Sequence, residues 1–272
     1  MNNSVLENSK ILLKFLNFPI IDGKDIFSCF ANLPNAICEN GKNKFERYVY
    51  IPGTRKDRVV LVAHTDTIWD ENYRDIKGET QNVILENGIF KGTNPKLGIG
   101  ADDRAGCAML WALKDSGHSL LLVDGEEKGK IGANFLKKHN PKLFKELNHH
   151  QFMLEFDWVG TNGCLYNQVD NTNKFKKFIE TTLKFTDSKA RGGTDLAILC
   201  HKICGVNLGV GYHKHHTIDE FLVLSEWENT LTQVNDFLSK PLPRFTCKFF
   251  APRIRFAKNI AHKLLKFLKL KK

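Results

Sequence analysis

"VVLVAHTD" (59–66) and "SLLLVDGEE" (119–127) are the two stretches that decide the fold. Each begins as a run of mainly apolar residues and then ends abruptly in polar ones. A strand that is apolar at nearly every position is buried on both faces, which is typical of a parallel sheet covered by helices. Strand-like runs at 152–157 and 205–211 predict two further members of the same sheet.

Segments with helical patterns alternate with these strands. They lie at 130–139, 173–185, 194–200 and 224–240. A buried helix is also expected after Arg104, and a short hairpin at 82–92 with its turn at Asn87-Gly88. The alternation predicts an α/β fold, a three-layer sandwich whose mixed, mostly parallel central sheet is covered by helices on both faces.

The net charge of +10 is concentrated at one end of the chain. Residues 242–272 hold ten Lys/Arg and no Asp/Glu, and the remaining residues are balanced. We therefore expect a catalytic domain over 1–241 and a basic amphipathic tail over 242–272, and no specific nucleic-acid partner. Within the tail, 254–270 has apolar residues at helical spacing with lysines between them. Two interpretations stay open: a last helix packed on the body, or peripheral contact with an anionic membrane.

The seven cysteines are irregularly spaced and odd in number, and no export signal is recognised. They are interpreted as reduced thiols, and the expected location is cytoplasmic, with the membrane periphery as the alternative.

Polar side chains follow strand after strand. The residues concerned are His64 and Asp66, Glu126 and Glu127, Asp157, and the histidines 213, 215 and 216, while Asp102 and Asp103 precede the predicted helix. Because the carboxyl ends of parallel strands meet at one edge, these groups are expected to gather there. Carboxylates so gathered repel one another and need cations between them. Imidazole and carboxylate without clustered thiolates suit zinc, manganese or cobalt, and the number of groups suits two ions.

Five motifs occur in the order found in the two-zinc exopeptidases. They are "VAHTD", "GADDRAG", "DGEEKGKIGA", "EFD" and "HHTIDE". Over residues 58–240 the chain resembles the clan that contains the zinc aminopeptidases, the tripeptidase and the related carboxypeptidases and deacylases. The resemblance implies two divalent ions, expected to be Zn²⁺ with Co²⁺ or Mn²⁺ as alternatives.

The resemblance also implies roles for individual residues. One ion is expected on His64, Asp102 and Asp157, and the other on Asp102, Glu127 and His216. Glu126 and Asp66 are the expected catalytic residues: Glu126 as the base that activates a metal-bridging water, and Asp66 as the carboxylate that orients His64. Asp103 is then the neighbour of the bridging Asp102, free to cap the helix.

Three features depart from the family pattern. Only about 35 residues separate Asp157 from "RGGTD" (191–195), too few for a separate lid domain. Trp158 occupies a position where a polar residue is expected. His213 and His215 crowd His216, which is preferred as the ligand because "HT-x-x-E" fits best there. Asp195 is expected to support the ligands or to cap a helix.

These expectations predict a metal-dependent aminopeptidase that acts on short peptides. Two alternatives stay open: an amidohydrolase or deacylase acting on N-acyl amino acids, and a non-catalytic peptidase-like binding protein. A one-zinc cyclase of similar fold is disfavoured because both ligand sets are intact.

Overall fold

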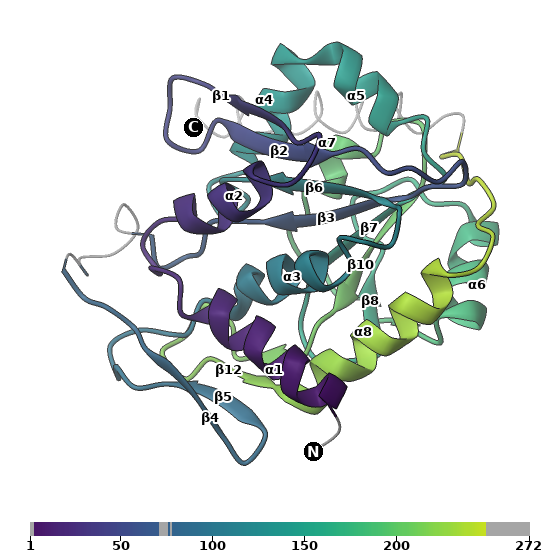
Figure 1. Cartoon of the computed structure of the whole chain (residues 1–272). Coiled ribbons are helices and arrows are strands. Elements are labelled where there is room, and N and C mark those ends of the chain that lie inside the picture. The colour runs from purple at the N-terminus through teal and green to yellow at the C-terminus, as the bar shows by residue number, and fades with distance from the viewer. Residues whose placement is uncertain (1–2, 71–75, 77, 249–272) are drawn as a thin grey trace, which may run out of the picture.

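A computed structural model describes residues 3–70, 76 and 78–248. Its centre is an eight-stranded sheet of order β1-β2-β6-β3-β7-β10-β8-β9 (Figure 1). The strands are β1 (Ile37–Asn40), β2 (Arg47–Ile51), β3 (Val60–His64), β6 (Ser119–Val123), β7 (Met153–Trp158), β8 (Gly163–Leu165), β9 (Thr186–Asp187) and β10 (Gly205–Gly209). Strands β6, β3, β7 and β10 run parallel, and β1, β2 and β8 are paired antiparallel. The predicted mixed, mostly parallel sheet is confirmed.

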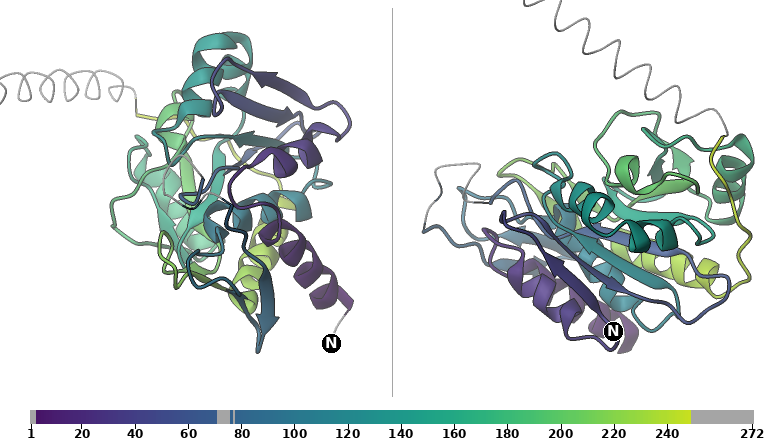
Figure 2. Two further views of the ribbon diagram at one scale, coloured as in Figure 1. Left: turned by 90° about the vertical axis from the view of Figure 1, so that its left-hand side faces the viewer. Right: turned by 90° about the horizontal axis from the view of Figure 1, so that it is seen from above.

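Helices cover both faces of this sheet (Figure 2). One face carries α1 (Asn3–Leu16), α2 (Lys24–Ala31), α3 (Ala101–Ala112), α6 (Asn173–Thr182) and α8 (Leu224–Leu238). The other carries α4 (Ile131–His139), α5 (Pro141–Leu147) and α7 (Leu196–Leu199). The three-layer sandwich is therefore confirmed as well.

Strand β3 shows why its sequence has no polar alternation. Leu61 and Ala63 belong to the hydrophobic cluster of the first face, and Val60 and Val62 to that of the second. All four side chains are fully buried. Burying a Val or Leu side chain stabilises a fold by about 1.5–3 kcal/mol, so a polar residue at any of these positions is disfavoured.

A second sheet of order β11-β12-β5-β4 lies beside the main one. Its strands are β4 (Val83–Glu86), β5 (Ile89–Gly92), β11 (Tyr212–His213) and β12 (Phe221–Val223). The predicted hairpin is confirmed as β4–β5, and its turn residues Asn87 and Gly88 both have positive φ, 50° and 79°. The pairing of β5 with β12 was not predicted. It holds β12, and the pairing of β12 with β11 then fixes both ends of the loop that carries residues 214–220.

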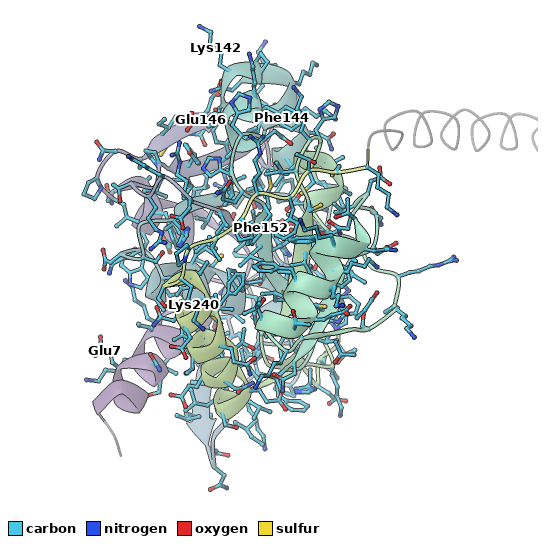
Figure 3. All side chains as sticks on the ribbon, turned by 90° about the vertical axis from the view of Figure 1, so that its right-hand side faces the viewer. Glu7, Lys142, Phe144, Glu146, Phe152 and Lys240 are labelled. Carbon is cyan, nitrogen blue, oxygen red and sulfur yellow. The ribbon has the colours of Figure 1, made fainter. Side chains whose placement is uncertain are left out.

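The first residues of the predicted tail pack on the body. Leu242 and Phe245 are buried, and Thr246 forms a bridge with Ile203. Phe152, labelled in Figure 3, makes an edge-to-face contact with Phe245 at a ring-centroid distance of 6.1 Å. The segment 254–270, for which membrane contact is predicted, lies outside the described residues. Within the part of the chain that is described, no helix has the length and apolar character needed to cross a bilayer.

Candidate metal centre

His64 is the last residue of β3, and its buried side chain is surrounded by carboxylates. Its Nε2 lies 3.2 Å from Asp102 Oδ1 and 3.5 Å from Asp157 Oδ1. Its Nδ1 lies 3.2 Å from Asp66 Oδ1. Both ring nitrogens therefore have acidic neighbours: Nδ1 faces Asp66, and Nε2 faces Asp102 and Asp157.

Asp102 lies in the irregular first turn of α3, and its second oxygen faces another imidazole. Asp102 Oδ2 is 3.2 Å from His216 Nε2, so this carboxylate stands between two histidines. Glu220 holds this turn in place, because its carboxylate accepts the N–H groups of Gly100 at 2.7 Å and of Asp102 at 3.2 Å. Burial and the charge of Asp102 raise the pKa of Glu220 to about 8.

The adjacent Asp103 faces away from this cluster. Its Oδ1 accepts the N–H of Gly106 at 3.0 Å, as an N-cap does, and its Oδ2 accepts the N–H of His64 at 3.1 Å. Both Asp102 and Asp103 have non-helical backbone angles, so the regular helix begins after them. The two neighbouring aspartates thus have different surroundings, and Asp103 caps the helix as expected.

Glu126 and Glu127 occupy the loop after β6. Glu127 Oε1 lies 2.7 Å from His216 Nε2, whereas Glu126 Oε1 lies 2.7 Å from Lys130 Nζ. The backbone N–H groups of residues 125, 126 and 127 all point at the carboxylate of Asp66, at 2.7, 3.1 and 3.2 Å. The two glutamates therefore differ in their partners, although they are consecutive.

Asp157, next to the last residue of β7, is the remaining carboxylate of the cluster around His64. Tyr212 donates its hydroxyl to Asp157 Oδ1 at 3.1 Å, and Asn207 donates its amide to the Asp157 carbonyl oxygen at 2.7 Å and, more weakly, to Oδ2 at 3.3 Å. Burial and the charge of Asp102 raise the pKa of Asp157 to about 8. Burial lowers the pKa of His216, but its contacts with Asp102 and Glu127 outweigh burial and raise it to about 10.

These residues fit divalent cations. The ligand atoms of His64, Asp102 and Asp157 lie within 4.8 Å of one another, as do those of Asp102, His215 and His216. Asp102 belongs to both groups, and its buried Oδ1 receives no hydrogen bond despite the nearby ring. A buried carboxylate oxygen that receives no hydrogen bond is costly, and a cation between these oxygen and nitrogen donors would remove that cost.

A model of peptidase family M28 matches residues 48–194, which is more than half of the chain. The chain belongs to this peptidase family. The M28 match spans the motifs that contain His64, Asp102, Glu126, Glu127 and Asp157. The chain is thus a peptidase of a metal-dependent family, and the expected resemblance to the two-zinc exopeptidases is confirmed. No curated protein matches the sequence significantly.

Solved structures of peptidases share the fold of this M28 chain. The aminopeptidase PepT from Bacillus cereus ATCC 10987 matches with a TM-score of 0.63 at 13% identity, over 86% of this chain and 98% of that one. A tripeptidase from Staphylococcus aureus matches with a TM-score of 0.61 at 14% identity, over 86% and 98%. An aminopeptidase from the archaeon Desulfurococcus kamchatkensis matches with a TM-score of 0.58 at 12% identity, over 88% and 96%. At these identities the likeness shows the fold alone.

The three histidines of the M28 chain near residue 215 have different environments. His216 contacts Asp102 and Glu127, as preferred from the sequence. His213 instead lies 2.8 Å from Glu226 on α8 and stacks on Phe221. His215 lines the cavity beside the acidic cluster, with its ring centroid 4.6 Å from that of His216.

The sequence analysis assigned no supporting role to three residues, Glu220, Asn207 and Tyr212. Glu220 is the last residue of the "HHTIDE" motif, which was a usable signal. Asn207 interrupts an otherwise apolar strand, and it too was a signal, because a buried amide needs polar partners. Asp195, expected near the ligands or at a helix cap, is fully buried at the start of α7 and makes no side-chain cap hydrogen bond.

Proposed function

We propose that the protein is a two-metal aminopeptidase that removes the N-terminal residue of short peptides. The observation that carries the proposal is the carboxylate of Asp102, which lies 3.2 Å from His64 on one side and 3.2 Å from His216 on the other. A single carboxylate between two imidazoles, each with a further acidic neighbour, suits a pair of ions that share one carboxylate.

His64, Asp102 and Asp157 would hold one ion, and Asp102, Glu127 and His216 the other. The donors are nitrogen and oxygen without thiolate, which favours Zn²⁺, with Co²⁺ or Mn²⁺ as alternatives. When bound, such ions polarise a carbonyl oxygen and lower the pKa of water. Asn207 and Tyr212 keep the Asp157 carboxylate oriented, and Glu220 does the same for the turn that carries Asp102.

Glu126 is the proposed general base. Whereas Glu127 Oε1 faces His216, a proposed ligand, the Oε1 of Glu126 is held by Lys130 at 2.7 Å. Oε2 is then the oxygen that takes a proton from the attacking water and passes it to the departing amine. Asp66 acts through its neighbours, because it fixes the His64 ring and the backbone of the Glu126–Glu127 loop.

Two measurements test the proposal. Purified protein should contain about two divalent ions per chain by elemental analysis. Metal-loaded protein should cleave aminoacyl amides and dipeptides, and a chelator should abolish this cleavage. Activity that is confined to N-acyl amino acids would favour a deacylase instead. Protein that binds no metal and hydrolyses no substrate would leave the binding-protein alternative.

A further inference from the structure

A small cavity lies beside the acidic cluster. Its volume is about 80 Å³, well below the roughly 300–1,000 Å³ of sites that enclose larger ligands. Acidic and imidazole groups line one part of it, together with Tyr212, and these groups are committed to one another or to the proposed ions. The remaining lining consists of Trp158, Val159, Gly192 and Gly193. This second wall is therefore the part of the lining best suited to an apolar substrate side chain.

Trp158 is the last residue of β7 and follows Asp157 directly. The pairing of β7 with β10 is irregular here: Glu155 is opposite Asn207, but Trp158 is opposite Gly209. Strand β7 thus has one residue more than β10 in this interval. Such a bulge redirects side chains at the end of a strand, and here both Asp157 and Trp158 line the same cavity.

The indole of Trp158 packs tightly on Gly192. A Cβ atom at Gly192 would lie 2.8 Å from Trp158 Cζ3, and one at Gly163 would lie 3.7 Å from Trp158 Cδ1. The carbonyl oxygen of Gly192 accepts hydrogen bonds from Asn167 Nδ2 at 3.2 Å and Gln168 Nε2 at 2.9 Å. These hydrogen bonds hold the Gly192 backbone in place, so this wall of the cavity does not move easily to admit a bulky substrate side chain.

The next glycine touches the proposed base. A Cβ atom at Gly193 would lie 2.8 Å from Glu126 Oε1 and 3.1 Å from Lys130 Nζ. Gly192 and Gly193 are therefore a thin layer between the Trp158 indole and the Glu126–Lys130 pair. The scissile carbonyl has to lie within reach of Glu126, so the side chain next to that carbonyl lies close to the indole.

We propose that Trp158 restricts the enzyme to peptides whose N-terminal residue has a small side chain, such as glycine, alanine or serine. This inference rests on the proposed aminopeptidase function. The indole occupies the space that the side chain of an N-terminal leucine or phenylalanine would need. One methylene in an apolar pocket changes kcat/KM by about 10–200-fold, so alanine is expected to exceed leucine by at least tenfold.

The experiment compares p-nitroanilides of Gly, Ala, Leu and Phe with wild-type protein and with W158A, W158F and W111A. Trp111 supplies the matched control, since it is half-buried on α3 against Phe15 and Phe30, in the α-helical layer rather than in the cavity lining. W158A is expected to raise the Leu/Ala ratio of kcat/KM at least tenfold, W158F by a smaller factor, and W111A not at all. Calorimetric binding of L-alanine and L-leucine, which are products, should show the same shift of preference toward leucine in W158A.

The second arm varies the other side of the bond, with Ala-Gly, Ala-Leu and Ala-Phe as substrates. Their kcat/KM values should differ less than those of the p-nitroanilides. The inference is overturned if the wild type cleaves Leu and Phe derivatives as fast as Ala, if W158A and W158F leave the ratio unchanged, or if selectivity follows the second residue. Should W158A lack a melting transition, W158F alone decides. No cleavage of any peptide or anilide by metal-loaded protein would overturn the proposed function together with this inference.

Discussion

The carboxylate of Asp66 accepts the backbone N–H of Glu126 at 3.1 Å, and so connects two motifs that lie 60 residues apart in the chain. The same carboxylate accepts the N–H groups of Gly125 and Glu127 and lies beside Nδ1 of His64. One side chain therefore sets the position of a proposed metal ligand on β3 and of the loop after β6. The first and third motifs form a single structural unit.

Asp66→Asn is expected to weaken metal binding by about 10–100-fold, the usual effect of losing the partner of a ligating histidine. An amide in place of the carboxylate has one acceptor oxygen fewer for three backbone donors and directs an N–H₂ at one of them. Metal affinity measured by competition with a chromogenic chelator checks this expectation. Asp70→Asn is the matched control, because Asp70 is equally buried but pairs with Lys44. Equal losses in both variants would mean that Asp66 supports only the fold.

Glu126→Gln and Glu127→Gln are expected to impair different properties, turnover in the first and metal binding in the second, although they change consecutive residues. Glu126→Gln should retain metal and lose roughly a hundredfold or more in kcat, as expected when a general base is removed. Glu127→Gln should lose metal first, because Glu127 Oε1 faces His216 Nε2 at 2.7 Å. Metal content and kcat, measured on the same preparations, separate the two roles. Turnover like that of the wild type in Glu126→Gln would assign the base elsewhere.

Much of this site was predictable, because the pattern of apolar residues along a strand indicates how it is buried. The unbroken apolar run of β3 predicted burial on both faces, and the polar residues after it marked the edge where ligands gather. The contacts of Glu220 with Gly100 and Asp102 were not predictable, since its carboxylate binds backbone N–H groups, which every residue type offers alike. Helix α5 was missed although Asn140-Pro141 is a helix-start signal, with Asn140 accepting the N–H of Leu143. Strands β11 and β12 are too short to show any alternation.

His150 predicts a pH dependence of stability that does not involve the metal centre. Its Nε2 faces Arg58 Nε at 3.2 Å and Ser119 Oγ at 2.9 Å, and its Nδ1 donates to the carbonyl of Glu146, a residue of α5 labelled in Figure 3. Burial lowers the pKa of His150 from 6.5 to about 4. The folded protein thus binds fewer protons than the unfolded chain between these values. The stabilisation is complete above pH 6.5 and is lost as the pH falls toward 4.

The contribution of His150 to this loss is at most about 3 kcal/mol. Urea unfolding at pH 7.0 and pH 4.5 measures it, and His150→Gln should show a smaller decrease in the free energy of unfolding than the wild type. The exposed neighbour offers a control, His149→Gln, which should behave like the wild type. A decrease of the same size in His150→Gln would assign the pH dependence to other groups.

The aromatic group around Phe245 sets where the chain can be shortened. Phe245 packs on Phe175 and Phe178 with ring-centroid distances of 5.2 and 4.9 Å, and the N–H of Leu242 binds Asp57. A protein that ends at Lys240 loses these contacts, and removal of a buried phenylalanine costs about 3–5 kcal/mol. Thermal melting should therefore occur at a clearly lower temperature for a protein ending at Lys240 than for one ending at Lys248. Equal melting temperatures would contradict the role of this segment in the core.

A protein that ends at Lys248 is therefore the right comparison for the predicted membrane contact of 254–270. The full chain should sediment with vesicles of phosphatidylserine and phosphatidylcholine at low salt and dissociate as salt rises, because lysines near anionic headgroups contribute about 1 kcal/mol each and are screened by ions. The shortened protein should keep its peptidase activity and stay in the supernatant. Vesicles of phosphatidylcholine alone control for apolar adsorption. Sedimentation of both proteins to the same extent, or of neither, would exclude this segment as an electrostatic anchor.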